Sequence, residues 1–324
     1  MKKFDVISFG SAILDVLLKS PDFQIAKSKK VFTQSSLMIP YGVKSEVSDL
    51  VFSSGGGGTN TAVGLARLGL KTALVARCGW DFAGKIIRQE IKKEKVFDEF
   101  LVQLEDEKTD YSTILIGPDG NRTILVWRGG TRLEADIIDF KKLNSFWFYL
   151  ASLEGNLDLL ERLIDFAQKN HIKVAVNPGK REIKEKEKLI PLLQKVEVLL
   201  INQEEAKLLG DLSSLTKTMV AVTSGEKGVL LKVPGKGQPA CRQGRLKMAG
   251  FKVKMVDQTG AGDGFGCGFI GGLAKGLEIE KALKLGVANG ASVVTKIGAK
   301  EGLIRQTEVD YWLEKPLKCQ WQKK

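Results

Sequence analysis

The sequence has very little histidine, and its cysteines form no metal-binding pattern. His171 is the only histidine among 324 residues, and Cys78, Cys241, Cys267 and Cys319 lie far apart with no C-x-x-C spacing. The sequence therefore has almost none of the residues that a zinc site or a histidine-based catalytic triad requires. Any acid–base catalysis has to rest on a carboxylate or a lysine.

Long apolar runs are missing as well. No stretch approaches eighteen uninterrupted apolar residues, which argues against a transmembrane helix. The start of the chain, MKKFDVISFG, has a basic pair, but Asp5 and then Asp15 interrupt the segment that follows. It therefore lacks the apolar run and cleavage site of a signal peptide. We expect a cytoplasmic protein with no membrane partner. With 43% hydrophobic residues, a chain of this length can bury a substantial core.

Positive charge is in excess, and the formal net charge is +12. The basic residues interleave with glutamate, as in KREIKEK at residues 180–186, which is typical of a solvated helix face. These stretches have no interleaved aromatics, so no nucleic-acid partner is predicted, whereas an anionic small substrate is compatible with the charge. We expect the basic tail, residues 318–324, to be a loosely held terminus.

Short apolar runs alternate with helical patterns along most of the chain. The pattern predicts strands at residues 6–10, 72–78, 146–151, 173–177, 196–202 and 219–223, and helices at residues 59–68, 81–94, 157–170 and 204–209. Such alternation predicts an α/β fold whose parallel sheet is covered on both faces. Helical patterns also fill the C-terminal part, at residues 262–276, 279–296 and 307–314.

Two regions, roughly residues 14–54 and 98–130, interrupt this alternation with short strands. In the second, residues 111–116 and 122–127 are joined by the turn GPDG at residues 117–120. Both regions leave the main sheet from neighbouring points. We expect them to meet as a small β lid over the C-terminal strand edge, where such sheets bind ligands.

Two glycine patterns match nucleotide-binding motifs by letter only. Residues 79–86, GWDFAGKI, have the spacing of a Walker A loop, but Ile86 stands where a magnesium-binding Ser or Thr is needed. We interpret this stretch as a strand-to-helix turn. Gly266-x-Gly268-x-x-Gly271 matches the dinucleotide fingerprint, yet it lies inside a helical run, where small residues favour helix packing instead.

The stretch DQTGAGDGFGCGF, residues 257–269, precedes a clearly helical segment. A helix start exposes unpaired N–H groups and a partial positive charge, and small residues let a ligand approach. The stretch therefore fits a reaction centre around Asp263. On its own it fits a flexible turn followed by helix-packing glycines equally well.

A second glycine segment, GGGGTNTAVGLARLG at residues 55–69, changes this balance. Together with residues 257–263 it resembles the two signatures of the ribokinase-like (PfkB) family of sugar and nucleoside kinases. The resemblance extends to GSAILD at residues 10–15, GWDFAG at 79–84, Asn202-x-x-Glu205 and Thr223-x-Gly225-x-x-Gly228. It implies a single kinase domain over residues 1–324, with a three-layer α/β/α, mostly parallel sheet and a small β-sheet lid.

The resemblance implies an enzyme that phosphorylates a primary hydroxyl of a sugar with ATP. Phosphoryl transfer needs positioning, charge stabilisation and a carboxylate to take the hydroxyl proton, a role that suits Asp263. The backbone N–H groups of Gly260, Ala261 and Gly262 would form an anion hole for the transferred phosphate.

For the sugar, the resemblance implies that Asp15 and Asn60 bind hydroxyl groups and that Gly56 and Gly57 allow close backbone approach. Glu154 is a further candidate for this side of the site. A short acid can accept from two neighbouring hydroxyls and so rejects analogues that lack them. From the residues alone, a strand-end turn at Asp15 and a helix cap at Asn60 stay open.

For the nucleotide, the resemblance implies that Asn202 and Glu205 organise magnesium-bound water and the phosphates, a task suited to oxygen ligands. Thr223, Gly225 and Gly228 resemble the nucleotide-binding turn. A plain hairpin turn is the alternative for these three residues.

Asp257 and Thr259 resemble the start of a monovalent-cation loop, which makes a potassium ion a hypothesis. Val293, Lys296 and Gly298 occupy the region expected to complete this loop. Lys296 could supply or displace the positive charge.

Other functions stay open at this point. The apolar Ile13, where a ribokinase pattern has Asn, favours a nucleoside kinase as the alternative acceptor class. A non-catalytic sugar-binding homologue and a nucleotide-binding oxidoreductase are weaker alternatives. The lid, as an open sheet edge, is compatible with a homodimer formed through it, and a monomer is the alternative.

Overall fold

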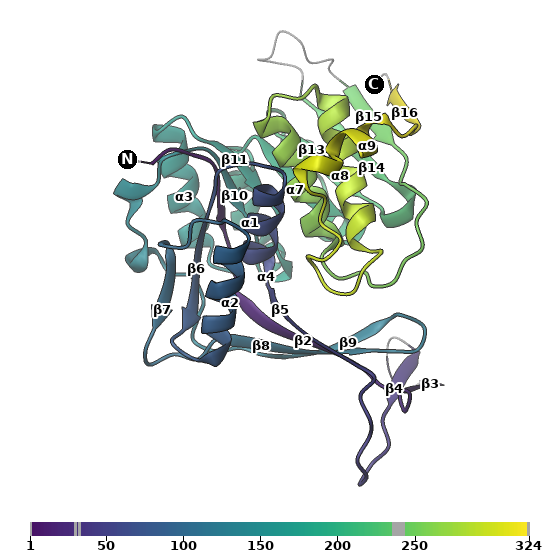
Figure 1. Cartoon of the computed structure of the whole chain (residues 1–324). Helices are drawn as coiled ribbons and strands as arrows, with labels where there is room; N and C mark the ends of the chain where they lie inside the picture. The colour runs from purple at the N-terminus through teal and green to yellow at the C-terminus, as the bar shows by residue number, and fades with distance from the viewer. Residues whose placement is uncertain (1, 29–30, 32–33, 235–243, 323–324) are drawn as a thin grey trace.

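A ten-stranded sheet runs through the protein in the computed structural model, which describes residues 2–28, 31, 34–234 and 244–322 (Figure 1). Seven neighbouring strands are parallel, and three antiparallel strands extend one side. The order is β16 (Cys319–Gln322), β15 (Gly244–Met248), β14 (Val229–Val233), β13 (Met219–Thr223), β12 (Val198–Asn202), β11 (Lys173–Val176), β10 (Ser145–Leu150), β1 (Phe4–Phe9), β6 (Thr72–Gly79) and β7 (Leu101–Leu104).

Helices cover both faces of this sheet. Their bounds are α1 (Gly57–Arg67), α2 (Phe82–Lys93), α3 (Leu157–Lys169), α4 (Lys180–Lys184), α5 (Lys186–Leu193), α6 (Gln203–Leu209), α7 (Ala261–Ala274), α8 (Ile279–Val293) and α9 (Val309–Glu314). Short 3-10 turns lie at Ala135–Ile137, Phe140–Lys142, Gly225–Lys227 and Gln306–Glu308.

The alternation of side chains along each strand divides the core in two. On β10, Phe148 faces the side covered by α3 and α5, whereas Tyr149 faces the side covered by α7 and α8. Successive strand residues point to opposite faces, so one continuous apolar strand can supply both cores. The three-layer, mostly parallel α/β/α fold predicted from the sequence is confirmed.

A separate four-stranded sheet projects from the main body (Figure 1). Its order is β5 (Asp49–Gly55), β2 (Ile13–Lys19), β8 (Asp110–Ile116) and β9 (Arg122–Trp127), and a two-stranded hairpin of β3 (Gln24–Lys27) and β4 (Ser35–Met38) lies beyond it. We call the four-stranded sheet the lid. Strand β7 lies within the range expected for the lid, but it pairs with β6 in the main sheet.

The predicted strands and helices all overlap elements of the structure. The structure also shows what the two stretches that match nucleotide-binding motifs by letter form. Asp81 caps α2 by accepting from the Gly84 N–H at 2.8 Å, so residues 79–86 form a strand-to-helix turn. A β-carbon built on Gly268 would lie 2.8 Å from the Gly286 Cα, and one on Gly272 would lie 2.7 Å from the Ala282 Cα. The glycines of α7 therefore serve close packing against α8.

The expectation of a loosely held tail is wrong for residues 319–322. They form β16, which pairs antiparallel with β15, and the indole N–H of Trp321 donates to Glu280 at 2.9 Å. A half-buried tryptophan and a free sheet edge hold this segment, although lysines flank it on both sides. Among the helices of the described ranges, none is long and apolar enough to cross a membrane.

Candidate active site

The glycine segments meet at the edge of the sheet where the parallel strands end. Strand β1 ends at Phe9, and a β-carbon on the following Gly10 would lie 2.8 Å from the Gly58 nitrogen at the start of α1. One on Gly57 would lie 2.8 Å from the Ala151 Cβ, just after β10. These contacts need glycine, because any side chain would separate α1 from the strand ends.

Helix α7 begins at this edge with a free N-terminus. Gly260 has φ 77° and ψ 3°, a left-handed conformation, and a β-carbon there would lie 2.6 Å from the Ala299 Cβ. Among the described residues, no side chain caps this helix start. A β-carbon on Gly262 would meet no heavy atom within 4 Å. The first turn thus leaves backbone N–H groups and open space at the positive end of a helix.

Asp263 lies in that first turn, and Asn60 of α1 holds it. The Asn60 amide donates to Asp263 Oδ2 at 2.8 Å. Burial raises the pKa of Asp263 to about 6; the Asn60 hydrogen bond and the Lys300 charge lower it, and Asp15 raises it. Helix α1 has Gly56 as its N-cap, so the alternative of a helix cap at Asn60 is wrong. The structure shows Asn60 positioning Asp263, a contact that spacing alone did not reveal.

Asp15 lies within strand β2 of the lid rather than in a strand-end turn. Burial raises its pKa, while Lys300, a hydrogen bond from Ser112 and Arg128 act against this rise. A β-carbon on Gly55 would collide with the Asp15 carboxylate. Gly56 has φ 89°, and its β-carbon would lie 2.5 Å from the Ser11 carbonyl oxygen. The glycine turn therefore leaves room for the Asp15 carboxylate.

Glu154 shares an arginine with Asp110. Arg128 of the lid contacts Glu154 Oε1 at 2.9 Å and Asp110 Oδ2 at 2.7 Å. Glu154 has φ 58°, a left-handed conformation rare outside glycine, and burial raises its pKa while Arg128 lowers it. The sequence analysis missed Arg128 and Asp110, because neither stands in a recognisable motif.

Asn202 and Glu205 make a reciprocal capping box at the start of α6. The Glu205 N–H donates to Asn202 Oδ1 at 3.0 Å, and the Asn202 N–H donates to Glu205 Oε2 at 2.8 Å. Burial raises the pKa of Glu205, and its hydrogen bond with Asn202 and the nearby Lys180 lower it. The two side chains therefore lie side by side at this helix start. Glu205 Oε1 takes no part in this box.

Thr223 ends strand β13 directly opposite Asn202 on β12. Gly228, with φ 90°, packs against residues 248–250, where a β-carbon would lie 2.7 Å from the Gly250 nitrogen. Gly225, with φ 54°, has no heavy atom within 4 Å of a built β-carbon. The turn joins the antiparallel pair β13 and β14, as the hairpin alternative expected, but only Gly228 is needed for packing.

Asp257 is buried below the start of α7. Its Oδ1 accepts from the N–H and the hydroxyl of Thr259 at 2.9 and 2.7 Å, and its Oδ2 accepts from the Gly298 N–H at 2.9 Å. The nearby cation is Arg122 of β9, whose guanidinium lies 3.8 Å from Oδ1. Lys296 is exposed, so the positive charge near Asp257 comes from the lid.

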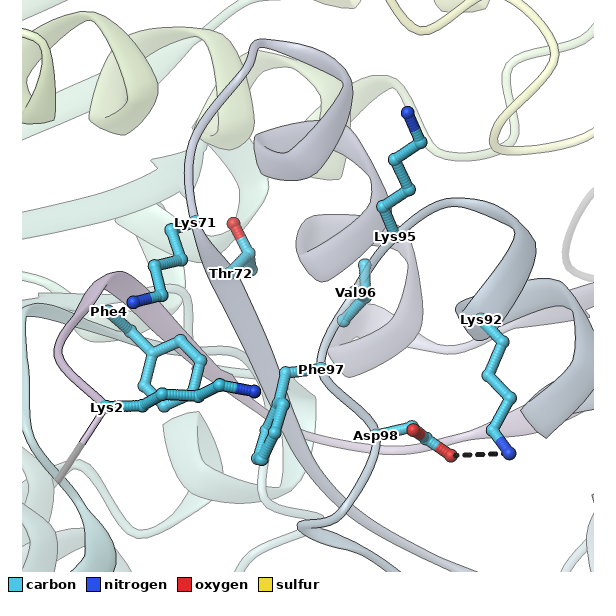
Figure 2. Close-up of a pocket in the computed structure, with 9 residues that line it drawn as sticks. All are labelled: Lys2, Phe4, Lys71, Thr72, Lys92, Lys95, Val96, Phe97 and Asp98. Atoms are coloured by element: carbon cyan, nitrogen blue, oxygen red, sulfur yellow. Dashed lines mark ion pairs between the residues drawn. The ribbon is translucent and has the colours of Figure 1, made fainter.

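The cavity shown in Figure 2 lies elsewhere. It has a volume of about 330 Å³ and lies where β1 and β6 begin, lined by Phe4, Thr72, Phe97 and four lysines among others. Lys2 and Lys71 lie over the Phe97 and Phe4 rings, and Lys92 faces Asp98. Because parallel strands place ligands at their carboxyl ends, this cavity is not the candidate active site.

The fold is a three-layer α/β fold with glycine turns at the carboxyl edge of its parallel strands, and comparison with known proteins specifies the family. The pattern of the pfkB family carbohydrate kinases matches residues 4–306. The chain therefore belongs to the PfkB family and is a sugar kinase by class. A ribokinase from Haemophilus influenzae is 27% identical over 315 residues, which cover 94% of this chain and 97% of that protein.

Solved structures agree on the fold. A nucleoside kinase from Methanocaldococcus jannaschii matches with a TM-score of 0.75 and 23% identity, over 97% of this chain and 98% of that one. A ribokinase from Arabidopsis thaliana, solved with ribose and ATP, matches with a TM-score of 0.74 and 19% identity, over 96% and 99%.

Replacing Gly262 by alanine should separate stability from turnover. Because the β-carbon enters open space and alanine favours helix, the free energy of unfolding should stay unchanged or rise by up to about 1 kcal/mol. The rate of phosphoryl transfer should fall about 10-fold, since the methyl group occupies the space before the helix N–H groups. Urea unfolding and an ADP-release assay measure the two effects.

Gly268→Ala is the matched control on the same helix, and it should lose stability through its contact with α8. A fully active Gly262→Ala enzyme would mean that no phosphate approaches this turn.

Proposed function

We propose that the protein is an ATP-dependent kinase that phosphorylates a primary hydroxyl of a sugar, with Asp263 as the base. The observation that supports this most is the place of Asp263, a carboxylate with a raised pKa in the first turn of an uncapped helix, held by Asn60. The Arabidopsis ribokinase of the same fold binds ribose and ATP, which supports both substrate classes.

Asp263 would accept the hydroxyl proton as the oxygen attacks phosphorus. A base works best when its pKa lies near the working pH, and burial moves Asp263 toward that range. The 2.8 Å hydrogen bond from Asn60 occupies Oδ2, which leaves Oδ1 for the acceptor. That oxygen lies 3.9 Å from the position of a β-carbon on Gly57, and glycine there keeps the approach open.

The N–H groups of Gly260, Ala261 and Gly262 would stabilise the negative charge of the transferred group. Fixed dipoles that point at developing charge need no reorganisation during the reaction. The left-handed Gly260 turns the chain into the helix, and the open space at Gly262 admits a phosphate. Ala261 has one competing bond, a long one of 3.4 Å to the Gln258 carbonyl.

Asp15, Asn60, Gly56, Gly57 and Glu154 would line the acceptor side. Asp15 projects from the lid toward the glycine turn, so closure of the lid and binding of the hydroxyls would be coupled. Arg128 fixes Glu154 and lies near Asp15, which adds a guanidinium to the polar groups available to a sugar.

Asn202, Thr223, Gly225 and Gly228 would hold the nucleotide side. Magnesium keeps several waters and is bound through one or two carboxylates together with phosphates, so the unshared Oε1 of Glu205 fits a contact through water. When bound, the ion supplies charge neutralisation at the phosphates. The residues of the chain would position the ion.

Asp263→Asn should lower turnover by at least about 10²-fold while nucleotide binding persists, because the amide cannot take the proton. In the wild type the base must be ionised. With a pKa of about 6, the rate should rise with pH through that region and level off above it. ADP release and nucleotide titration at several pH values test this. Retained turnover would remove Asp263 from the role of base.

A nucleoside is the alternative acceptor. Ile13 and Leu14 are both buried beside Asp15, and the nucleoside kinase of the same fold supports this class as well. A coupled ADP-release screen over pentoses, hexoses, ketoses, their phosphates and nucleosides decides between the two. We expect a sugar to give the highest kcat/KM, and Asp15→Asn should raise the KM for that sugar while leaving the KM for ATP. A nucleoside preferred over every sugar would establish the alternative.

Potassium fits the Asp257 loop poorly. Both oxygens of Asp257 already accept hydrogen bonds, and Arg122 faces it with a positive charge. We therefore expect equal rates, within about twofold, in potassium, sodium and choline chloride at the same ionic strength, where screening is matched. A rate several-fold higher in potassium would show that Asp257 and Thr259 bind the ion despite Arg122.

The outer surface of the lid supports a homodimer. Leu50 and Phe52 on edge strand β5, and Val126 and Trp127 on edge strand β9, are each about half exposed. Open edges with apolar side chains are surfaces that favour pairing. Sedimentation at micromolar concentration distinguishes a dimer from a monomer, and Phe52→Ser should weaken the dimer.

A further inference from the structure

Lys300 is a buried lysine that no sequence motif indicated. It lies in the loop after α8, and only 2% of its side chain is exposed. Its ammonium contacts the Ser54 carbonyl oxygen, the Ser54 Oγ at 2.7 Å and Glu90 Oε1 of α2 at 3.4 Å. A charge is buried at high cost unless it is paired and hydrogen-bonded, so this arrangement needs a reason.

Glu90 and Lys300 together hold both backbone groups of Ser54. Glu90 Oε2 accepts from the Ser54 N–H at 2.7 Å, while Lys300 takes the carbonyl. Arg67 of α1 donates to the carbonyl of Lys300 itself. Lys300, in the loop after α8, therefore links the end of β5 to α1 through Arg67 and to α2 through Glu90.

Ser54 immediately precedes the glycine turn. The next residue, Gly55, lies against the Asp15 carboxylate, and Gly57 lies near Asp263. A displacement of Ser54 would pass directly into this turn, because the glycines have no side chains to anchor them.

We propose that Lys300 is a positioning residue of the reaction: it fixes Ser54, and through it the glycine turn, and it supplies the fixed positive charge that faces both Asp15 and Asp263. The inference deepens the proposed function and depends on it, since it assumes that Asp263 takes the proton. Lys300 touches neither substrate in this role.

Four titratable groups face Asp263 from the packed elements: Asp15 from β2, Tyr149 from β10, Cys267 from α7 and Lys300. Burial raises the pKa of Tyr149 and of Cys267 well above their ordinary values, so both stay neutral during turnover. Lys300 and Asp15 are the two remaining titratable neighbours. Burial lowers the pKa of Lys300, and Glu90 and Asp15 oppose this.

Lys300→Met tests the charge while keeping most of the volume. The measurement is the pH dependence of kcat/KM for the acceptor, whose acid limb reports the base of the free enzyme. Without the ammonium, this limb should move to higher pH by about 1 unit, and Lys300→Arg should restore part of the wild-type position. Lys275→Met, which removes the same charge from the far end of α7, should leave the limb unchanged.

Glu90→Gln should move the acid limb in the opposite direction. This variant still tests the inference if Lys300→Met does not fold. It removes a negative charge and leaves Lys300 uncompensated, so the acid limb should move to lower pH. If Lys300 only held Ser54 in place, both variants would lose activity, but their acid limbs would not move in opposite directions. An acid limb at the wild-type position in either folded variant overturns the inference, whereas a wild type with no kinase activity overturns the proposed function instead.

Discussion

The hydrogen bond from Asn60 to Asp263 joins residues 203 positions apart, and the geometry of the site depends on it. It ties the first turns of α1 and α7 together at the carboxyl edge of the sheet. Both turns carry the positive end of a helix, so an anionic side chain between them is stabilised although it is largely removed from water. The same removal from water raises the pKa of Asp263 toward the range in which a carboxylate can act as a base.

Bringing two helix starts so close requires the absence of side chains. Gly10 and Gly58 touch where β1 passes α1, and Gly260 touches Ala299 where the chain enters α7. Farther along α7, Gly264 lies against Val293 and Gly268 against α8, so the helix cannot withdraw from the sheet edge. The glycines therefore fall into two groups. Those at the helix starts allow close contact with neighbouring backbone, apart from Gly262, which faces open space, and those farther along α7 set its distance from α8.

The sequence was sufficient for the parallel strands other than β7, for most of the helices and for the glycine turns, because these depend on local spacing and on the alternation of apolar residues. It did not reveal Arg122, Arg128 or Lys300, since a single basic residue in a chain with many lysines carries no signal until its partner is known. The 319–322 segment was misjudged for a related reason: its composition is that of a tail, and only the open edge of β15 makes it a strand. The Asn202-x-x-Glu205 pattern did not indicate that the two residues would cap their own helix.

These basic residues share a feature that relates the lid to the reaction. Arg122 and Arg128 lie on or beside β9, and each faces an acid that lies outside the lid, Asp257 and Glu154 respectively. Lys300 reaches in the other direction, from the main body to Ser54 on lid strand β5. Two ion pairs and the hydrogen bonds of one buried lysine thus connect the lid to the main body. Side chains that are fixed in this way hold positive charge at the boundary between the lid and the main body without a bound ion, and fixed charges of this kind need no reorganisation when a negative charge develops nearby.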